Sequence, residues 1–328
     1  HCFPEERLPK VFDSLEQASH LGYQEPQTAA EQRVNVARDS QMFAPVAENP
    51  LTPEEDVTGH LFRRARTYLQ ERRTEDGVPF FLWLSIPDPH PPYMVPEPYA
   101  SIYNNVDVPA PVWREGEMEN KPYRQQCIVE WNAFEREYPT PADRRRLKAV
   151  YWGMVTYIDT EFGKLMDTLR RTGLEQNTIV VFTTDHGDYM GNHRMIRKGP
   201  HLYEDLTHIP QIVYWKDKIA PQRTDAFTEN IDVMPTLLDF AGVPLPEGVQ
   251  GRSFKPLLLG TMRTHRDRVF MEHGEPGAVA TPETLNQEDY RRLGASRTHH
   301  LCPEIRRGRV KGVRNGRWKF CTTPGDVD

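Results

Sequence analysis

The chain has 328 residues, of which 38% are hydrophobic and 27% are charged, and its formal net charge is −6. This balance is typical of a folded globular protein. It argues against disorder, against a general nucleic-acid binder and, since no apolar run approaches about 20 residues, against a membrane span. The four cysteines lie too far apart for a zinc ribbon, one bridge such as Cys302–Cys321 stays open, and cysteine usage is compatible with a cytoplasmic or an exported protein.

The first element with a clear beginning is a helix. After a polar stretch over residues 1–50, Thr52-Pro53-Glu54-Glu55 combines an N-cap, a proline at the first helical position and a capping-box glutamate. Apolar residues then recur at helical spacing up to Leu69, and Gly77 ends the segment. We therefore expect a helix that begins here and packs by one face.

A strand and a long excursion are expected next. Residues 80–85 are a short, continuous apolar run, which is typical of a strand buried on both faces of a sheet. The proline-rich residues 87–98 form a loop, and residues 100–140 are expected to be a long surface excursion. We expect residues 94–140 to shape substrate specificity.

Thr140-Pro141 predicts the start of a second, longer helix, and Gly173 suits the position just beyond its end. Apolar residues between them fall on one face at helical spacing. This stripe comprises Leu147, Val150, Met154, Val155, Ile158, Phe162, Leu165, Met166 and Leu169.

Two further candidate strands follow, at residues 178–183 and 211–215, and residues 234–240 predict a short helix closed by Gly242. Strands that alternate with helices indicate an α/β fold with a mostly parallel sheet and helices on both faces. In such sheets, ligands bind beyond the carboxyl ends of the strands.

The pattern changes after residue 260. Residues 269–273 are one short strand candidate, and residues 310–313 and 317–321 flank Asn315-Gly316, a strong hairpin signal. We therefore predict a catalytic α/β domain over residues 1–260 and a small, incomplete antiparallel subdomain over residues 261–328.

The segment Thr184–His193, TDHGDYMGNH, carries the clearest chemistry. It follows a predicted strand, so Asp185 and His186 are expected at a strand's carboxyl end, where an aspartate suits a cation better than packing. A carboxylate oxygen favours a hard ion such as Ca²⁺, and the imidazole also admits Mn²⁺ or Zn²⁺. Taken alone, an Asp-His pair favours a turn with surface histidines, because isolated motif matches are often false.

Residues 185–193 closely resemble the metal-binding D-[HN]-G-x-x-x-G-x-H signature of sulfatases in the alkaline phosphatase superfamily, and every fixed position is present. The resemblance covers most of residues 50–260 and implies an alkaline phosphatase-like fold. It also implies that Asp185 and His186 bind a divalent cation, with Ca²⁺ as the first expectation and Mn²⁺ as the alternative.

The resemblance gives roles to two more residues. A lysine such as Lys198 is usually solvated at a surface, but in the family a lysine shortly after the signature contacts the sulfate group. His90, in the string DPHPPY, could be a simple hydrogen-bond donor in a rigid loop. The string resembles the family segment whose histidine reaches the sulfate and the leaving-group oxygen, so we expect both side chains to face one anion.

The start of the chain is similar to the family in a different way. His1 matches the last residue of the G-K-x-H motif and is a candidate for the base that collapses the sulfated intermediate. Cys2 begins CFPEER, whose arginine falls one residue too late for the nucleophile motif C-x-P-x-R, so we reject Cys2 as the nucleophile. We expect that motif, the first aspartate pair and the first lysine to precede His1, outside this chain.

The resemblance implies metal-dependent hydrolysis of a small-molecule or saccharide sulfate ester. The nucleophile would be a formylglycine upstream of this chain, made by a formylglycine-generating enzyme, so the chain alone is expected to be inactive. Two alternatives stay open: a phosphonate monoester or phosphodiester hydrolase with nearly the same site, and a non-catalytic binding module that keeps the fold. The sequence names neither a particular substrate nor an oligomeric state.

Overall fold

The computed structural model describes residues 46–72, 78–121, 125, 126, 129, 134–199, 201–274 and 309–322. They divide into two compact units. The first unit runs to Ala110 and resumes over Tyr138–Leu174, and the second comprises Pro111–Glu137 and the chain from Glu175 onward.

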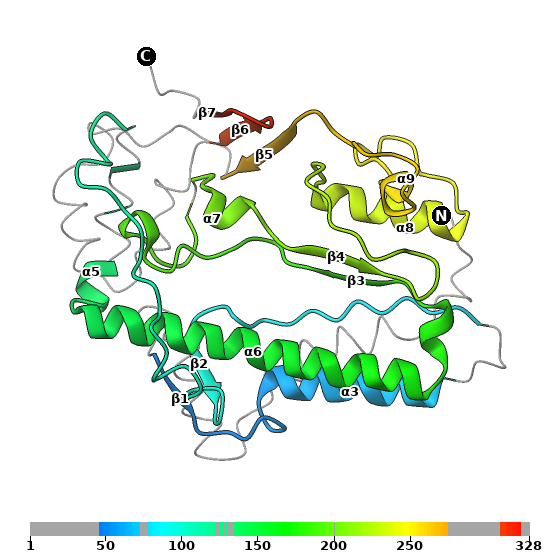
Figure 1. Cartoon of the computed structure of the whole chain (residues 1–328), viewed down its shortest axis with the longest axis horizontal. Coiled ribbons are helices and arrows are strands. Elements are labelled where there is room, and N and C mark those ends of the chain that lie inside the picture. Colours follow the sequence, from blue (N-terminus) through cyan, green and yellow to red (C-terminus); the bar gives the residue numbers. More distant parts are fainter. Residues whose placement is uncertain are drawn as a thin grey trace. The chain divides into compact units, whose positions relative to one another are not determined.

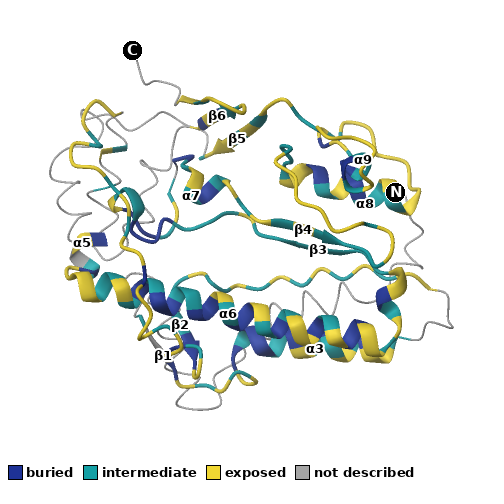
Figure 2. Ribbon diagram, in the orientation of Figure 1, coloured by how far each residue is buried: buried dark blue, intermediate teal, exposed yellow. Residues whose placement is uncertain are grey.

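Two helices form the core of the first unit, α3 (Val57–Glu71) and α6 (Pro141–Arg171) (Figure 1). Their buried residues lie in stripes along each helix (Figure 2). The start and end predicted for α6 are confirmed, because Thr140 and Asp143 form a reciprocal capping box and Gly173 has a φ of 74°. Its predicted stripe is mostly buried, but Val155 is exposed and Tyr157 is buried in its place.

Helix α3 begins at Val57, later than the predicted start at Pro53. The predicted capping box does form, since the Glu55 carboxylate accepts a hydrogen bond from the backbone N of Thr52 at 3.0 Å. It closes an isolated turn, however, because the Pro53 carbonyl accepts a hydrogen bond from the Tyr157 hydroxyl at 2.5 Å. Asp56 then caps the helix itself.

The predicted strand over residues 80–85 is wrong, because no residue of this run is in a strand. Its side chains alternate in burial, and the exposed fractions of Phe81 and Trp83 are 58% and 65%. The run has the alternation of a strand, but none of the described strands pairs with it. The sheet of the first unit consists instead of the parallel strands β1 (Ala47–Asn49) and β2 (Met94–Pro96).

The second unit contains the predicted strands β3 (Val180–Thr183) and β4 (Gln211–Tyr214). The α/β class holds, but these strands are antiparallel, with Thr183 opposite Gln211. A parallel connection needs a crossover of about a dozen or more residues, usually an α-helix, whereas the described residues between these two strands contain one α-helix, the short α7 (Glu204–Thr207). Among the described strands only β1 and β2 are parallel, so the expected mostly parallel sheet is not found there.

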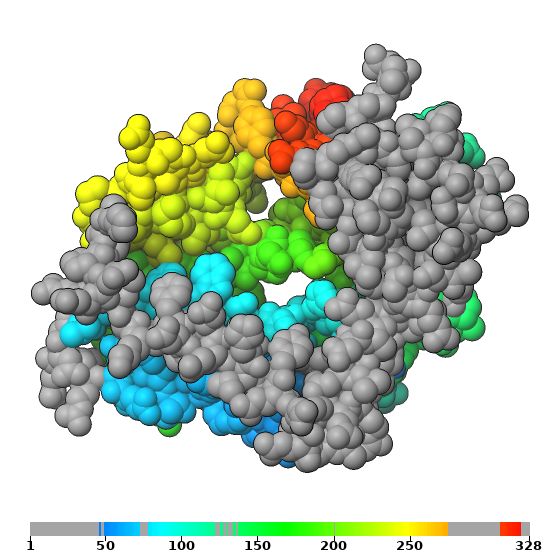
Figure 3. Space-filling model, turned by 180° about the vertical axis from the view of Figure 1, so that it is seen from behind, coloured from blue at the N-terminus to red at the C-terminus, as the bar shows by residue number. Residues whose placement is uncertain are grey.

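The C-terminal hairpin is confirmed. Strands β5 (Val269–His273), β6 (Val310–Arg314) and β7 (Lys319–Thr322) form one antiparallel sheet. Asn315 makes the turn, since its side-chain oxygen accepts hydrogen bonds from the two backbone N–H groups that lead into β7. Part of this sheet, orange and red in Figure 3, is exposed at the surface, whereas Val310 of β6 is buried. A separate domain over residues 261–328 stays a prediction.

Short helices complete the second unit. The predicted short helix is α8 (Val233–Ala241), which ends at Gly242 with a φ of 68° as expected. The others are α5 (Phe134–Glu137), α9 (Lys255–Leu258) and the 3-10 turns η4 (Asn192–Arg194) and η5 (Asn230–Asp232), while η3 (Leu174–Asn177) begins at the boundary between the units. None of the described helices is long and apolar enough to cross a membrane. Cys321 is a free thiol, and Cys302 lies outside the described residues.

Candidate functional site

The candidate metal ligands lie just beyond the end of β3. Asp185 is highly exposed, with 83% of its side-chain area accessible, and His186 is partly exposed. The Asp185 carboxylate accepts a hydrogen bond from the backbone N of His186 at 2.9 Å, and its other oxygen lies 3.6 Å from Nε2 of the imidazole. The carboxylate oxygen of Asp185 and Nε2 of His186, the two atoms that could coordinate a metal ion, therefore lie close together.

The tautomer of His186 follows from its two contacts. Nδ1 lies 2.8 Å from the carbonyl oxygen of Gly187 and must donate its hydrogen there. Nε2 then carries the lone pair and accepts a hydrogen bond from the Lys198 ammonium at 3.1 Å. A carbonyl that fixes Nδ1–H and leaves Nε2 for coordination is the usual arrangement of a metal-binding histidine.

The donor set fits part of a metal site. An oxygen ligand and a neutral imidazole suit a divalent cation. Among the described residues, no group of three or more histidines, cysteines, aspartates or glutamates is placed to hold a metal ion. Asp185 and His186 can therefore serve as two ligands of a larger coordination shell, and a cation on Nε2 would release the Lys198 ammonium toward an anion.

The loop that follows is packed tightly against α7. The backbone N of Gly187 donates to the carbonyl of Leu206 at 3.0 Å, and a Cβ at this glycine would lie 1.9 Å from the carbonyl oxygen of Asp205. The Asp188 carboxylate joins the two arms of the loop by accepting hydrogen bonds from the backbone N of Met190 and of Arg197, at 2.9 and 3.0 Å. Only glycine fits beside α7 at position 187, which explains this position of the motif.

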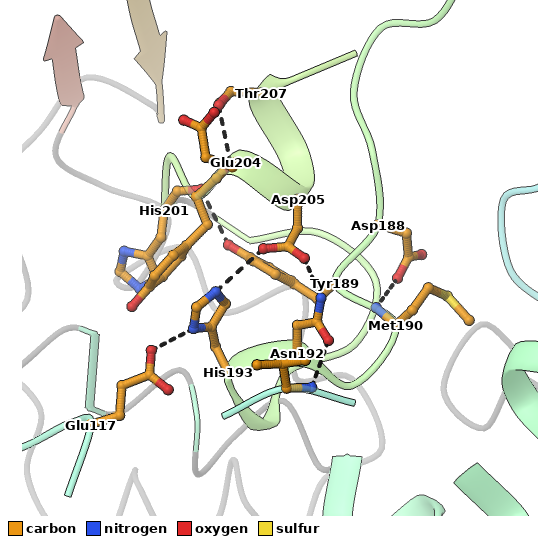
Figure 4. Close-up of polar contacts among 12 residues, drawn as sticks. Glu117, Asp188, Tyr189, Met190, Asn192, His193, His201, Glu204, Asp205 and Thr207 are labelled. Carbon is orange, nitrogen blue, oxygen red and sulfur yellow. Dashed lines mark hydrogen bonds and ion pairs between the residues drawn. The ribbon is translucent and has the colours of Figure 1, made fainter. Parts of the chain in front are cut away.

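A polar cluster that the sequence did not indicate connects this loop to Glu117 and to Asp205 of α7 (Figure 4). The His193 ring contacts the carboxylates of Glu117 and Asp205 and stacks on Tyr203, with ring centroids 3.9 Å apart. In the sequence, His193 stands out only as the last position of the motif. Glu117 is far away in the chain, and neither carboxylate stood out in the sequence.

His90 belongs to the first unit, in an exposed turn. Its Nδ1 donates a hydrogen bond to the Pro91 carbonyl at 2.7 Å, which orients the ring. The neighbouring Asp88 is fixed by the Thr58 hydroxyl, which donates to its carboxylate at 2.7 Å. The convergence of His90 with Asp185 and Lys198 on one anion stays a prediction. His1 and Cys2 lie outside the described residues.

The residue types on this loop suggest what it can bind. An aspartate and a histidine beyond a strand can bind a divalent cation, and a lysine on the same loop can bind an anion. Structural comparison finds similar folds among hydrolases of anionic esters. The similar structures include a phosphonate monoester hydrolase from Silicibacter pomeroyi, with a TM-score of 0.70 and 25% identity over 98% of this chain and 62% of that one.

The family model named Sulfatase matches residues 12–243, and the chain therefore belongs to the sulfatase family of the alkaline phosphatase superfamily. An arylsulfatase of Clostridium perfringens is 35% identical over 206 residues, which are 62% of this chain and 42% of the relative. A multifunctional alkaline phosphatase superfamily protein of Trinickia caryophylli is 34% identical over 60% of this chain and 40% of its own length. The chain thus spans about two fifths of these relatives.

Proposed function

We propose that this chain is part of an enzyme that hydrolyses sulfate esters, in which Asp185 and His186 bind a divalent cation and Lys198 binds the ester anion. The observation that carries the proposal is the 3.1 Å contact between Lys198 and the coordinating nitrogen of His186, beside an exposed carboxylate. His186 belongs to the signature and Lys198 follows it on the same loop, in a chain that belongs to the sulfatase family. Ca²⁺ is the first expectation for the ion and Mn²⁺ the alternative.

The roles of the residues follow from their charges. The cation, when bound, supplies positive charge that stabilises the anionic ester as its bond breaks. Lys198 adds a fixed charge on the same side, and Gly187 keeps His186 in the tautomer that can coordinate. His90 is proposed to donate a proton to the departing oxygen, and His1 to act as the base. The nucleophile is proposed to be a formylglycine outside this chain, made by a formylglycine-generating enzyme, and the substrate a small-molecule or saccharide sulfate.

A second candidate is hydrolysis of phosphonate monoesters by the same residues. It is supported by the similarity to the phosphonate monoester hydrolase of Silicibacter pomeroyi at a TM-score of 0.70. The two functions differ in the preferred ester, so rates on an aryl sulfate and an aryl phosphonate, measured with one preparation of a longer protein that carries the nucleophile, separate them. A higher kcat/KM on the phosphonate would replace the first proposal by the second.

Calorimetric titration of Ca²⁺ and Mn²⁺ into that longer protein tests the metal site. D185A removes one ligand and should weaken binding by about 10–100-fold or more, since loss of a supporting group alone costs that much. D225A, which removes an exposed aspartate outside the loop, is the matched control and should bind as tightly as wild type. Equal affinity of D185A and wild type would refute Asp185 as a ligand.

A further inference from the structure

The loop that carries the candidate site has an uncommon backbone. Met190, His193, Arg194 and Arg197 have φ angles of 46°, 56°, 60° and 64°. Residues with a side chain rarely adopt positive φ, because Cβ then crowds the following carbonyl oxygen. Such a backbone persists only where the surrounding structure holds it.

Acidic side chains distant in sequence hold this loop. Arg194 pairs with Glu135 at 2.5 Å, and Arg197 pairs with Glu137 at 2.8 Å, so both arginines are bound to α5. His193 is the third basic residue in the series. Its backbone N also donates to the carbonyl of Val112 at 2.9 Å.

His193 differs from the two arginines because its charge depends on pH. Its Nδ1 contacts the Glu117 carboxylate and its Nε2 lies 3.3 Å from Oδ2 of Asp205, while the ring stacks on Tyr203. These three are the titratable groups that face the imidazole among the described residues. A neutral imidazole has one N–H and would turn a lone pair toward one of the two anions, so the arrangement requires the imidazolium.

Asp205 connects this imidazole to the candidate ligands. Asp205 is the second residue of α7. Its backbone packs directly on Gly187 and leaves no room for a Cβ at position 187. Gly187 in turn accepts the hydrogen bond that fixes the ring of His186. A displacement of α7 would therefore move His186 relative to Lys198.

We propose that His193 is a positioning residue of this site: its imidazolium joins Glu117 to Asp205 and thereby holds the loop that presents His186 and Lys198. We call the contact of the His193 imidazolium with Glu117 and Asp205 the latch. The latch is a property of the loop, and only its consequence for the site rests on the proposed function. Deprotonation removes one of the two hydrogen bonds and opens the latch.

The direction of the pH dependence follows from the pKa of His193. Burial acts to lower this pKa, but the hydrogen bonds to Asp205 and Glu117 outweigh burial and raise it above the ordinary 6.5. The latch is therefore complete below pH 6.5 and is lost as the pH rises through the higher value of the closed loop. Between these two values the ratio of closed to open loop falls by up to about tenfold per pH unit.

Amide hydrogen exchange of residues 186–199, followed by mass spectrometry from about pH 5.5 to about pH 8.5 and corrected for the intrinsic rate, tests the latch. The 328-residue chain is used without metal or substrate. Protection in wild type should fall across the window. H193Q should lose protection at low pH relative to wild type and show no pH dependence. H60Q is the matched control and should behave as wild type. Burial and Arg63 lower the pKa of His60, which is the opposite of the shift at His193.

E117Q distinguishes a charge latch from simple packing. The amide introduced by E117Q can donate to Nδ1 of a neutral His193 ring, which then donates from Nε2 to Asp205. Protection should therefore survive while its pH dependence is lost. Protection in wild type that does not change with pH, or E117Q with the pH dependence of wild type, would overturn the proposal. If H193Q does not fold, these two measurements decide. Metal binding is measured separately, so a failure of the proposed function leaves the exchange result interpretable.

Discussion

Gly187→Ala tests whether the packing of the candidate site on α7 has the consequences that its geometry implies. The new Cβ would lie 1.9 Å from the Asp205 carbonyl oxygen and 3.1 Å from its carbonyl carbon, whereas ordinary van der Waals contact begins at 3.4 Å. Both atoms belong to the backbone, so no side chain can rotate away. The loop and α7 must separate, which also stretches the 3.0 Å hydrogen bond from Gly187 to Leu206.

The cost can be assembled from two effects. Overpacking costs about 1–3 kcal/mol and loss of a hydrogen bond about 0.5–1.5 kcal/mol, so we expect G187A to lower the free energy of unfolding by about 1.5–4.5 kcal/mol. The displaced His186 should also bind metal more weakly. Urea unfolding monitored by circular dichroism measures the first effect, and calorimetry on the longer protein measures the second.

Gly163→Ala is a control with the opposite sign. Gly163 lies inside α6, and nothing lies within 4 Å of the position of its Cβ. Alanine should stabilise the helix by about 0.5–1 kcal/mol, because it restricts the unfolded chain. If G187A unfolds at the same urea concentration as wild type, the contact between residue 187 and α7 does not exist in solution and the reasoning fails.

Three further outcomes are expected. K198A should lower kcat of the longer protein on an aryl sulfate by about 10²–10³, the usual loss of one group that stabilises transition-state charge, and the exposed K218A should not. D232N should lower the free energy of unfolding by about 3–5 kcal/mol, because it leaves Arg266 beside a buried neutral amide. Burial raises the pKa of Asp232, but the hydrogen bonds from Arg266 and from the backbone N–H groups of Arg252 and Glu229 together lower it below the ordinary 3.8. The wild-type contribution therefore exists above pH 3.8 and is lost as the pH falls through the lower folded-state value, which acid titration of both proteins checks. The 328-residue chain alone should show no turnover of an aryl sulfate, and robust turnover would bring Cys2 back as a nucleophile.

Local signals were sufficient for several elements. The capping box at Thr140, the glycine after α8 and the turn at Asn315 each satisfy backbone groups within a few residues, and the structure contains all three as expected. At Thr52 the local hydrogen bonds also form, but the Tyr157 hydroxyl, distant in sequence, binds the turn, and the helix begins later than predicted. A capping signal shows that a turn is favoured, and tertiary contacts decide whether a helix continues from it.

Sheet partners were outside the reach of the sequence. The side chains of residues 80–85 alternate in burial as they do in a strand. A strand exists only when a neighbour supplies hydrogen bonds, however, and the described strands supply none to this run. The orientation of β3 and β4 depends in the same way on how residues 184–210 return across the unit. Hydrophobic pattern indicates that a segment can enter a sheet and leaves its partner and direction unspecified.

The candidate site also contains residues that the sequence could identify and residues that it could not. Asp185, His186 and Lys198 lie within one loop, so a motif could select them together, and the structure brings His186 and Lys198 to within 3.1 Å. Glu117 reaches His193 from 76 positions away, through a carboxylate that has no motif around it. Residues that supply the chemistry can be recognised because the chemistry restricts their type and spacing. Residues that hold the loop in a backbone with positive φ need only bring the right charge to the right place, and many sequences can do so. Their identification therefore requires the folded structure, and the pH dependence of the loop is the property through which an experiment can detect them.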